Sequence, residues 1–182
     1  MTTTETTQPQ RRSTEEGQLR FLSVCIDNTN LRDLVLATVR QFDPRQLIPV
    51  AAAGAGITFQ PRVLIGLVTY CYASGVFSSQ EIEARVRKDP ILVLICGQEL
   101  PDWHVIRRFR RYNHEAIQRC LEATLYHANA VSRSRSSSSP EGNEAMLPAA
   151  RSCEVVDAEQ CRKDAGERIR RAIHLDHMFL DE

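Results

Sequence analysis

The sequence has little net charge, few aromatic residues and no long apolar run. It carries 23 basic and 23 acidic residues in 182, so contact with a nucleic acid would have to come from a local patch. The longest apolar run, at 63–72, is about half as long as a membrane-spanning helix requires. The N-terminus lacks the apolar core of a secretory signal. We therefore expect a cytoplasmic protein with no membrane contact.

The cysteines show no paired motif. None of the six forms a C-x-x-C pair or has a histidine at zinc-finger spacing. Four of them fall among apolar residues or on apolar helix faces, which predicts reduced thiols in the core: Cys71, Cys96, Cys120 and Cys161. The loop AAAGAGITF at 51–59 does not match the dinucleotide-binding glycine pattern. No metal site and no cofactor are predicted.

Composition divides the chain into four segments. Residues 1–18 are rich in Thr, Gln and Glu, which is typical of a disordered tail because nothing there can be buried. A Ser-rich composition predicts a flexible linker over residues 131–156. Residues 19–130 then form the predicted compact domain, and residues 157–182 form a C-terminal amphipathic helix.

Apolar periodicity and end signals predict an all-α fold. Asn30 is a candidate N-cap, Pro61 suits the first residue of a helix, and Gly75 suits its end. Ser78 and Glu81 form a candidate capping box. The run ILVLIC is compatible with a buried strand, but its helical neighbours favour a helix. The expected helices cover 31–42, 61–74, 79–88, 91–96, 102–129 and 157–175.

The helix that begins after Asp102 carries an unusual concentration of positive charge. On a helical wheel Phe109 marks the core face, and most of the basic side chains lie opposite, with Glu115 as the one local acid. Guanidinium groups without acidic partners suit phosphate oxygens and guanine edges. The predicted DNA-binding residues are Trp103, His104, Arg107, Arg108, Arg110, Arg111, His114 and Arg119.

The segments before this helix favour a helix-turn-helix arrangement. A helix at 79–88, a short segment at 91–96 and a turn at 97–101 precede it, and the later helix of such a motif presents its N-terminal residues to the major groove. We expect Trp103, His104, Arg107 and Arg111 nearest the bases, with Arg108, Arg110 and Arg119 on the backbone. Alternatives stay open: the arginines form a solvated face, or they pair with acids elsewhere, such as Glu99 or the C-terminal segment. Trp103 could instead pack on Leu100.

The same region resembles the N-terminal (InsH-type) domain of bacterial insertion-sequence transposases of the DDE class. Roughly residues 19–130 share its order of motifs: a proline entering an apolar helix, Y-x-x-G-V-x-S-S-x-x-I-E, a D-P break, a glycine, and P-D-x-x-x-I-x-R-F-R. These are Tyr72, Gly75, Val76, Ser78, Ser79, Ile82, Glu83, Asp89, Pro90, Gly97, Pro101, Asp102, Ile106, Arg108, Phe109 and Arg110. The resemblance implies recognition of double-stranded DNA at transposon ends.

The residues after Ala130 do not continue this resemblance. They contain no β-periodic run, so we expect no RNase H-like DDE catalytic domain and no transposase activity. The C-terminal helix has an apolar stripe that would allow a homodimer, and the alternative is that it packs back on the domain. Three functions remain open: a DNA-binding regulator derived from a transposase, a protein-interaction module, or an inactive relic of a mobile element.

Overall fold

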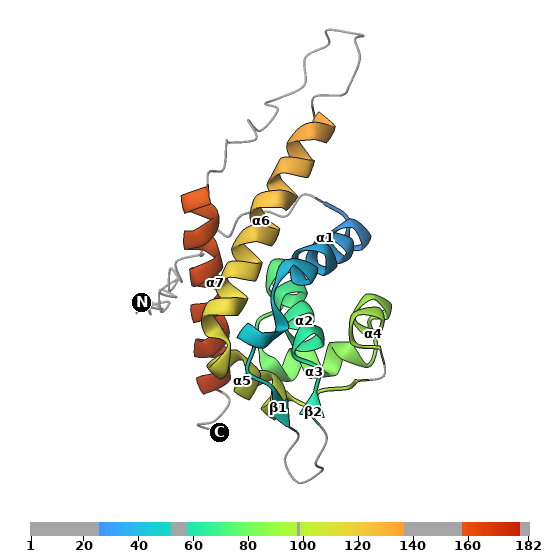
Figure 1. Cartoon of the computed structure of the whole chain (residues 1–182), viewed down its shortest axis with the longest axis vertical. Coiled ribbons are helices and arrows are strands. Elements are labelled where there is room, and N and C mark those ends of the chain that lie inside the picture. Colours follow the sequence, from blue (N-terminus) through green and yellow to red (C-terminus); the bar gives the residue numbers. More distant parts are fainter. Residues whose placement is uncertain (1–25, 52–57, 98, 137–157, 179–182) are drawn as a thin grey trace, which may run out of the picture.

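The structure, a computed structural model, describes residues 26–51, 58–97, 99–136 and 158–178 (Figure 1). Its helices confirm the predicted all-α class. They are α1 (Asn28–Gln41), α2 (Pro61–Ala73), α3 (Ser79–Val86), α4 (Pro90–Cys96), α5 (Trp103–Tyr112), α6 (His114–Ser136) and α7 (Ala158–Met178), with a 3₁₀ turn at Pro44–Gln46. The predicted tail at 1–18 and most of the predicted linker lie outside the described residues.

Helix α2 forms the centre of the domain, as its apolar sequence predicts. Its residues from Leu64 to Ala73 are all buried, and α1, α4, α5 and α6 pack around it. A helix that is apolar on every side gains its stability from burial on every side. The helices around α2 therefore share one hydrophobic core.

The end signals of the helices are confirmed in part. Pro61 begins α2, and Gly75 follows it with a φ of 87°, a conformation that glycine adopts without strain. The Asn30 cap is wrong, because Asp27 caps α1 and its Oδ1 accepts a hydrogen bond from Asn30 N at 2.8 Å. The capping box is also wrong: Ser78 makes no side-chain cap bond, and Glu81 pairs with Arg85.

A small antiparallel ladder was not predicted. Strand β1 (Val50–Ala51) pairs with β2 (Thr58–Phe59), and Val50 lies opposite Phe59. Both of these side chains are buried, while their neighbours in the ladder are exposed. A strand is predicted from alternating apolar and polar residues over several positions, and a strand of two residues is too short to show this alternation.

The predicted helix at 102–129 is two helices, because Asn113 interrupts it. The Asn113 side chain accepts a hydrogen bond from Ile48 N at 2.7 Å and donates to Ile48 O at 3.0 Å. This pairing ties the junction to the segment that leads into β1. Tyr112, the last residue of α5, is 52% exposed. Helix α6 also continues to Ser136, beyond the predicted end near Asn129 and into the predicted linker.

Helix α7 packs against α6 and runs antiparallel to it (Figure 1). Its apolar stripe is buried in the common core: Cys161, Ala165, Ile169 and Ala172. The structure therefore shows the alternative to the dimer, in which the helix packs back on its own domain. The homodimer stays a prediction.

The four core cysteines are buried, as predicted. Burial raises the pKa of the Cys96 thiol to about 12 and that of Cys120 to about 11, and it raises the pKa of Cys71 further. These groups stay protonated at neutral pH and behave as small apolar side chains. Cys25 and Cys153 lie outside the described residues.

Shortening the buried side chain of Ile169 tests whether α7 is part of the core. Ile169 is fully buried, whereas Lys163 on the same helix is exposed. Ile169→Ala should lower the free energy of unfolding by about 2–5 kcal/mol because it leaves a cavity. Lys163→Ala should change it by less than about 0.5 kcal/mol. Urea denaturation measures both, and equal effects would contradict the packing of α7.

Candidate nucleic-acid interface

Helix α5 is strongly amphipathic and is held at its N-terminus. Asp102 caps it, as predicted, and its Oδ1 accepts a hydrogen bond from Val105 N at 2.8 Å. Glu83 of α3 accepts a second hydrogen bond from Trp103 N at 3.1 Å. Val105, Ile106 and Phe109 are buried. The helix therefore has a fixed core face, and its opposite face is left for contact with solvent or a partner.

Arg110 corrects the predicted set of DNA-binding residues. It is 4% exposed, so it is not a surface contact. Its Nη2 donates to Asp176 Oδ2 of α7 at 2.6 Å, and its Nη1 donates to Tyr72 Oη of α2 at 3.1 Å. Wheel analysis of α5 alone placed Arg110 opposite the core. The side of α5 that carries it is covered by α7, which comes from the far end of the sequence.

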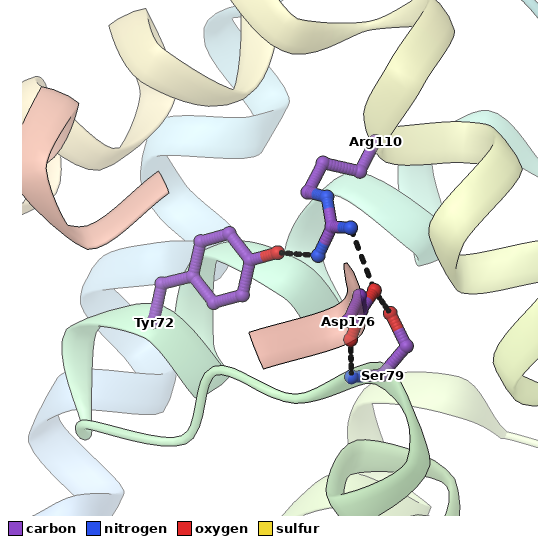
Figure 2. Close-up of polar contacts among 4 residues, drawn as sticks. All are labelled: Tyr72, Ser79, Arg110 and Asp176. Carbon is purple, nitrogen blue, oxygen red and sulfur yellow. Dashed lines mark hydrogen bonds and ion pairs between the residues drawn. The ribbon is translucent and has the colours of Figure 1, made fainter. Parts of the chain in front are cut away.

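Asp176 is the centre of this buried cluster (Figure 2). Besides Arg110, its Oδ1 accepts a hydrogen bond from Ser79 N at 2.8 Å, and its Oδ2 accepts one from Ser79 Oγ at 2.6 Å. The cluster joins the start of α3 to α2, α5 and α7. Burial raises the pKa of Tyr72 to about 12, although the Arg110 guanidinium opposes this shift. The tyrosine hydroxyl therefore stays neutral beside the ion pair.

A second buried arginine fixes α7 to the end of α2. Arg168 donates from Nε to Asp164 at 2.8 Å, and its Nη1 donates to the carbonyl oxygens of Tyr72 at 2.7 Å and Ala73 at 3.1 Å. Carbonyl groups at a helix C-terminus have no partner within the helix and attract cations. Asp164 and Asp176 therefore both bind arginine side chains of their own chain.

Four of the predicted residues come together in one pocket. Arg107 and Arg111 of α5 and His114 of α6 line a cavity of about 230 Å³, whose opposite wall is Ile173 and His177 of α7. Arg110 also lines it. The two α7 residues were not predicted, because they line the pocket from a part of the chain that is far from α5 in the sequence.

The other predicted residues lie apart from this pocket. Trp103 and His104 stack on each other with ring centroids 3.5 Å apart. Arg108 donates to Ala51 O at 3.2 Å. Arg119 lies over the ring of Phe42 at 5.9 Å and borders a second cavity with Glu122, Tyr126 and Arg162. Packing of Trp103 on Leu100 stays a prediction.

Most arginines of this face have no acidic partner. Over the described parts of the chain, none of Arg107, Arg108, Arg111 and Arg119 forms an ion pair. Glu99, considered as a partner, instead accepts a hydrogen bond from Gln60 N at 3.1 Å. Arg110 therefore pairs with an acid of its own chain, whereas the four arginines named above form no such pair among the described residues.

Two further features are absent from the described residues. No group of three or more His, Cys, Asp or Glu side chains there could hold a metal ion. Across the same segments, no helix combines the length and apolar character needed to cross a bilayer.

Comparison with known families decides the relationship. Residues 8–112 match the family described as Transposase domain (DUF772). The match covers more than half of the chain. The chain belongs to this family. No curated protein and no solved structure matches it significantly. The narrower assignment to InsH-type insertion-sequence transposases stays a prediction, as does the absence of transposase activity.

The family match ends where α5 ends, at Tyr112. Helices α6 and α7 therefore lie beyond the matched region, yet α7 supplies Asp176 to the cluster around Arg110. Helix α5 lies within the matched residues, but one of its buried contacts comes from α7, which lies outside them.

Removal of the Asp176 carboxylate tests this cluster. Asp176→Ala leaves the Arg110 guanidinium buried without its counter-ion, which should lower the free energy of unfolding by about 3–5 kcal/mol. The pair of substitutions Arg110→Met and Asp176→Leu together should cost less than Asp176→Ala alone, because no unpaired charge is left.

A surface pair provides the control for this measurement. Glu81 and Arg85 are about half exposed and their side chains are 2.7 Å apart, so Glu81→Ala should cost less than about 1 kcal/mol. All variants are compared by urea denaturation. If Asp176→Ala costs no more than Glu81→Ala, the buried pair is not a structural constraint.

Proposed function

We propose that this protein binds double-stranded DNA through the exposed cations of α5 and of the first turns of α6. The observation that carries the proposal is the set of four arginines without an acidic partner among the described residues, in a chain of the transposase-domain family. His104 and His114, both exposed, extend this set along the same helices. Phosphate oxygens are the ligands that such guanidinium groups suit best.

The arrangement of α3, α4 and α5 supports a helix-turn-helix mode of binding. Helix α3 contacts both α4 and α5, and α5 begins after a turn that contains Gly97 with a φ of 61°. In this mode the N-terminal part of α5, with His104, would approach base edges, and Arg107 and Arg111 would contact phosphate groups. Arg108 and Arg119 would contact the backbone.

The buried cluster also supports the proposal, because it gives α5 a rigid base. Phe109 and Arg110 fix the inner side of the helix through apolar packing and two side-chain hydrogen bonds. A reading helix that is held in one orientation loses little conformational entropy on binding. A chain that occupies transposon-end-like duplexes in this way would compete with an element's transposase, and this is the regulatory role that we propose.

Replacement of two arginines of α5 tests the proposal. Selection from a random pool of duplexes identifies a binding sequence, and fluorescence anisotropy then measures its affinity. Arg107→Ala with Arg111→Ala should weaken binding by at least about tenfold, since a base or phosphate contact by arginine contributes about 1–3 kcal/mol. With about four arginines on phosphates, log affinity should fall against log salt with a slope of about −3 to −4.

The matched control removes the same charge from α1. Arg32→Ala with Arg40→Ala lies outside the α3–α5 segment and should weaken binding less than the α5 variant. Equal losses would indicate non-specific attraction to a polyanion. No duplex binding at low salt would overturn the proposal, and binding of an acidic protein instead would favour the interaction module.

A further inference from the structure

The pocket between α5 and α7 has the composition of an anion site. Arg107 and Arg111 stand one turn apart on α5, His114 begins α6, and His177 lies across from them near the end of α7. Every one of these side chains can donate N–H groups. The cavity, about 230 Å³, is not filled by any of them. One apolar residue, Ile173, completes the wall.

The charge balance around the pocket is positive. Arg110 also lines the cavity, but its charge is offset by Asp176. Asp176 accepts hydrogen bonds on both oxygens from Ser79 and Arg110, so its bonding capacity is largely used. Among the residues that the structure describes, no carboxylate lines the pocket. Arg107 and Arg111 therefore contribute two positive charges without a counter-ion among the described residues.

We infer that this pocket binds one phosphate group of a nucleic acid, held by the Arg107 and Arg111 guanidinium groups and by N–H donors of His114 and His177. This inference rests on the proposed function and names one contact within it. Arginine forks match the oxygens of phosphate in a bidentate arrangement. The Arg110–Asp176 pair fixes the distance between the two walls, so α7 completes the site although it lies beyond the family match.

The surroundings favour phosphate over the carboxylates of an acidic protein. Two more exposed side chains that can donate N–H groups, Arg108 and His104, lie on α5 beside the pocket residues. A row of cations along a helix suits the regularly spaced charges of a duplex backbone. Carboxylate binding is therefore an outcome of the test and not part of the inference.

Two histidines of α7 give a charge-matched experiment. His177 lines this pocket, whereas His174 lines a different cavity with Glu167, Arg170 and Arg171. His177→Glu and His174→Glu change the net charge equally and both lie at exposed positions near the end of α7. His177→Glu, which places a carboxylate in the pocket, should weaken duplex binding at least about tenfold more than His174→Glu does. Thermal unfolding of the full chain checks that both variants are folded.

The result separates the inference from the proposed function. If the wild-type protein binds duplex and the two variants bind it equally, the pocket inference is overturned while DNA binding stands. If the wild-type protein binds no duplex, the proposed function fails, and titration with inorganic phosphate decides the pocket. The single tryptophan, Trp103, lies one turn before Arg107 and reports such binding by fluorescence.

In that titration, a saturable change in Trp103 fluorescence supports a phosphate site that binds the free ion, provided that the His174→Glu variant shows the change and the His177→Glu variant does not. No signal in the wild-type protein overturns the inference. If binding of polyglutamate depends on His177, and binding of duplex and of phosphate does not, the pocket binds carboxylates. The phosphate assignment is then overturned.

Discussion

The position of α7 depends on one buried ion pair, between Arg110 and Asp176. Taking two charges out of water costs several kcal/mol per ion, and their attraction offsets this cost only when hydrogen bonds satisfy the remaining atoms. Here Ser79 and Tyr72 supply those bonds. The pair therefore adds little net stability, but any other docking of α7 would leave a charge unpaired. Its main effect is to select one arrangement of α7 on α5.

The same ion pair links α5 to the core. Tyr72 belongs to α2, the most buried helix, and Ser79 is the first residue of α3. Helices α3 and α5 correspond to the outer helices of the helix-turn-helix arrangement that we propose. One carboxylate of α7 thus contacts groups from both, and the geometry between them depends on a residue that the family match does not include.

The fold could be predicted from the sequence where the signals are local. The apolar run of α2, the proline and aspartate at helix starts, and the burial of four cysteines follow from neighbouring residues. The interruption at Asn113 could not, because its cause is a hydrogen bond to Ile48, 65 residues away. Periodicity continues across the interruption, so the two helices look like one.

The exposed face of α5 could be predicted from the sequence of that helix alone. The prediction was wrong for Arg110, because a helix from a distant part of the chain covers it. Arg107 and Arg111 are on the expected face, but Arg110 is covered by α7, whose Asp176 is 66 residues away. A signal was nevertheless present in the sequence. Asp164, Arg168 and Asp176 fall on or beside the apolar stripe of α7 at spacings of four and eight. Charged residues at such positions indicate buried partners.

The contacts of α7 also determine how it can move. Asp164 with Arg168 holds one part of the helix to the end of α2, and Asp176 holds another to α5. These two carboxylates are separated by twelve residues, about 18 Å along a helix. A helix fastened at two such points can neither slide by a turn nor rotate about its axis without breaking both. Loosening of α7 is therefore expected to be cooperative, with the helix either fully docked or fully released.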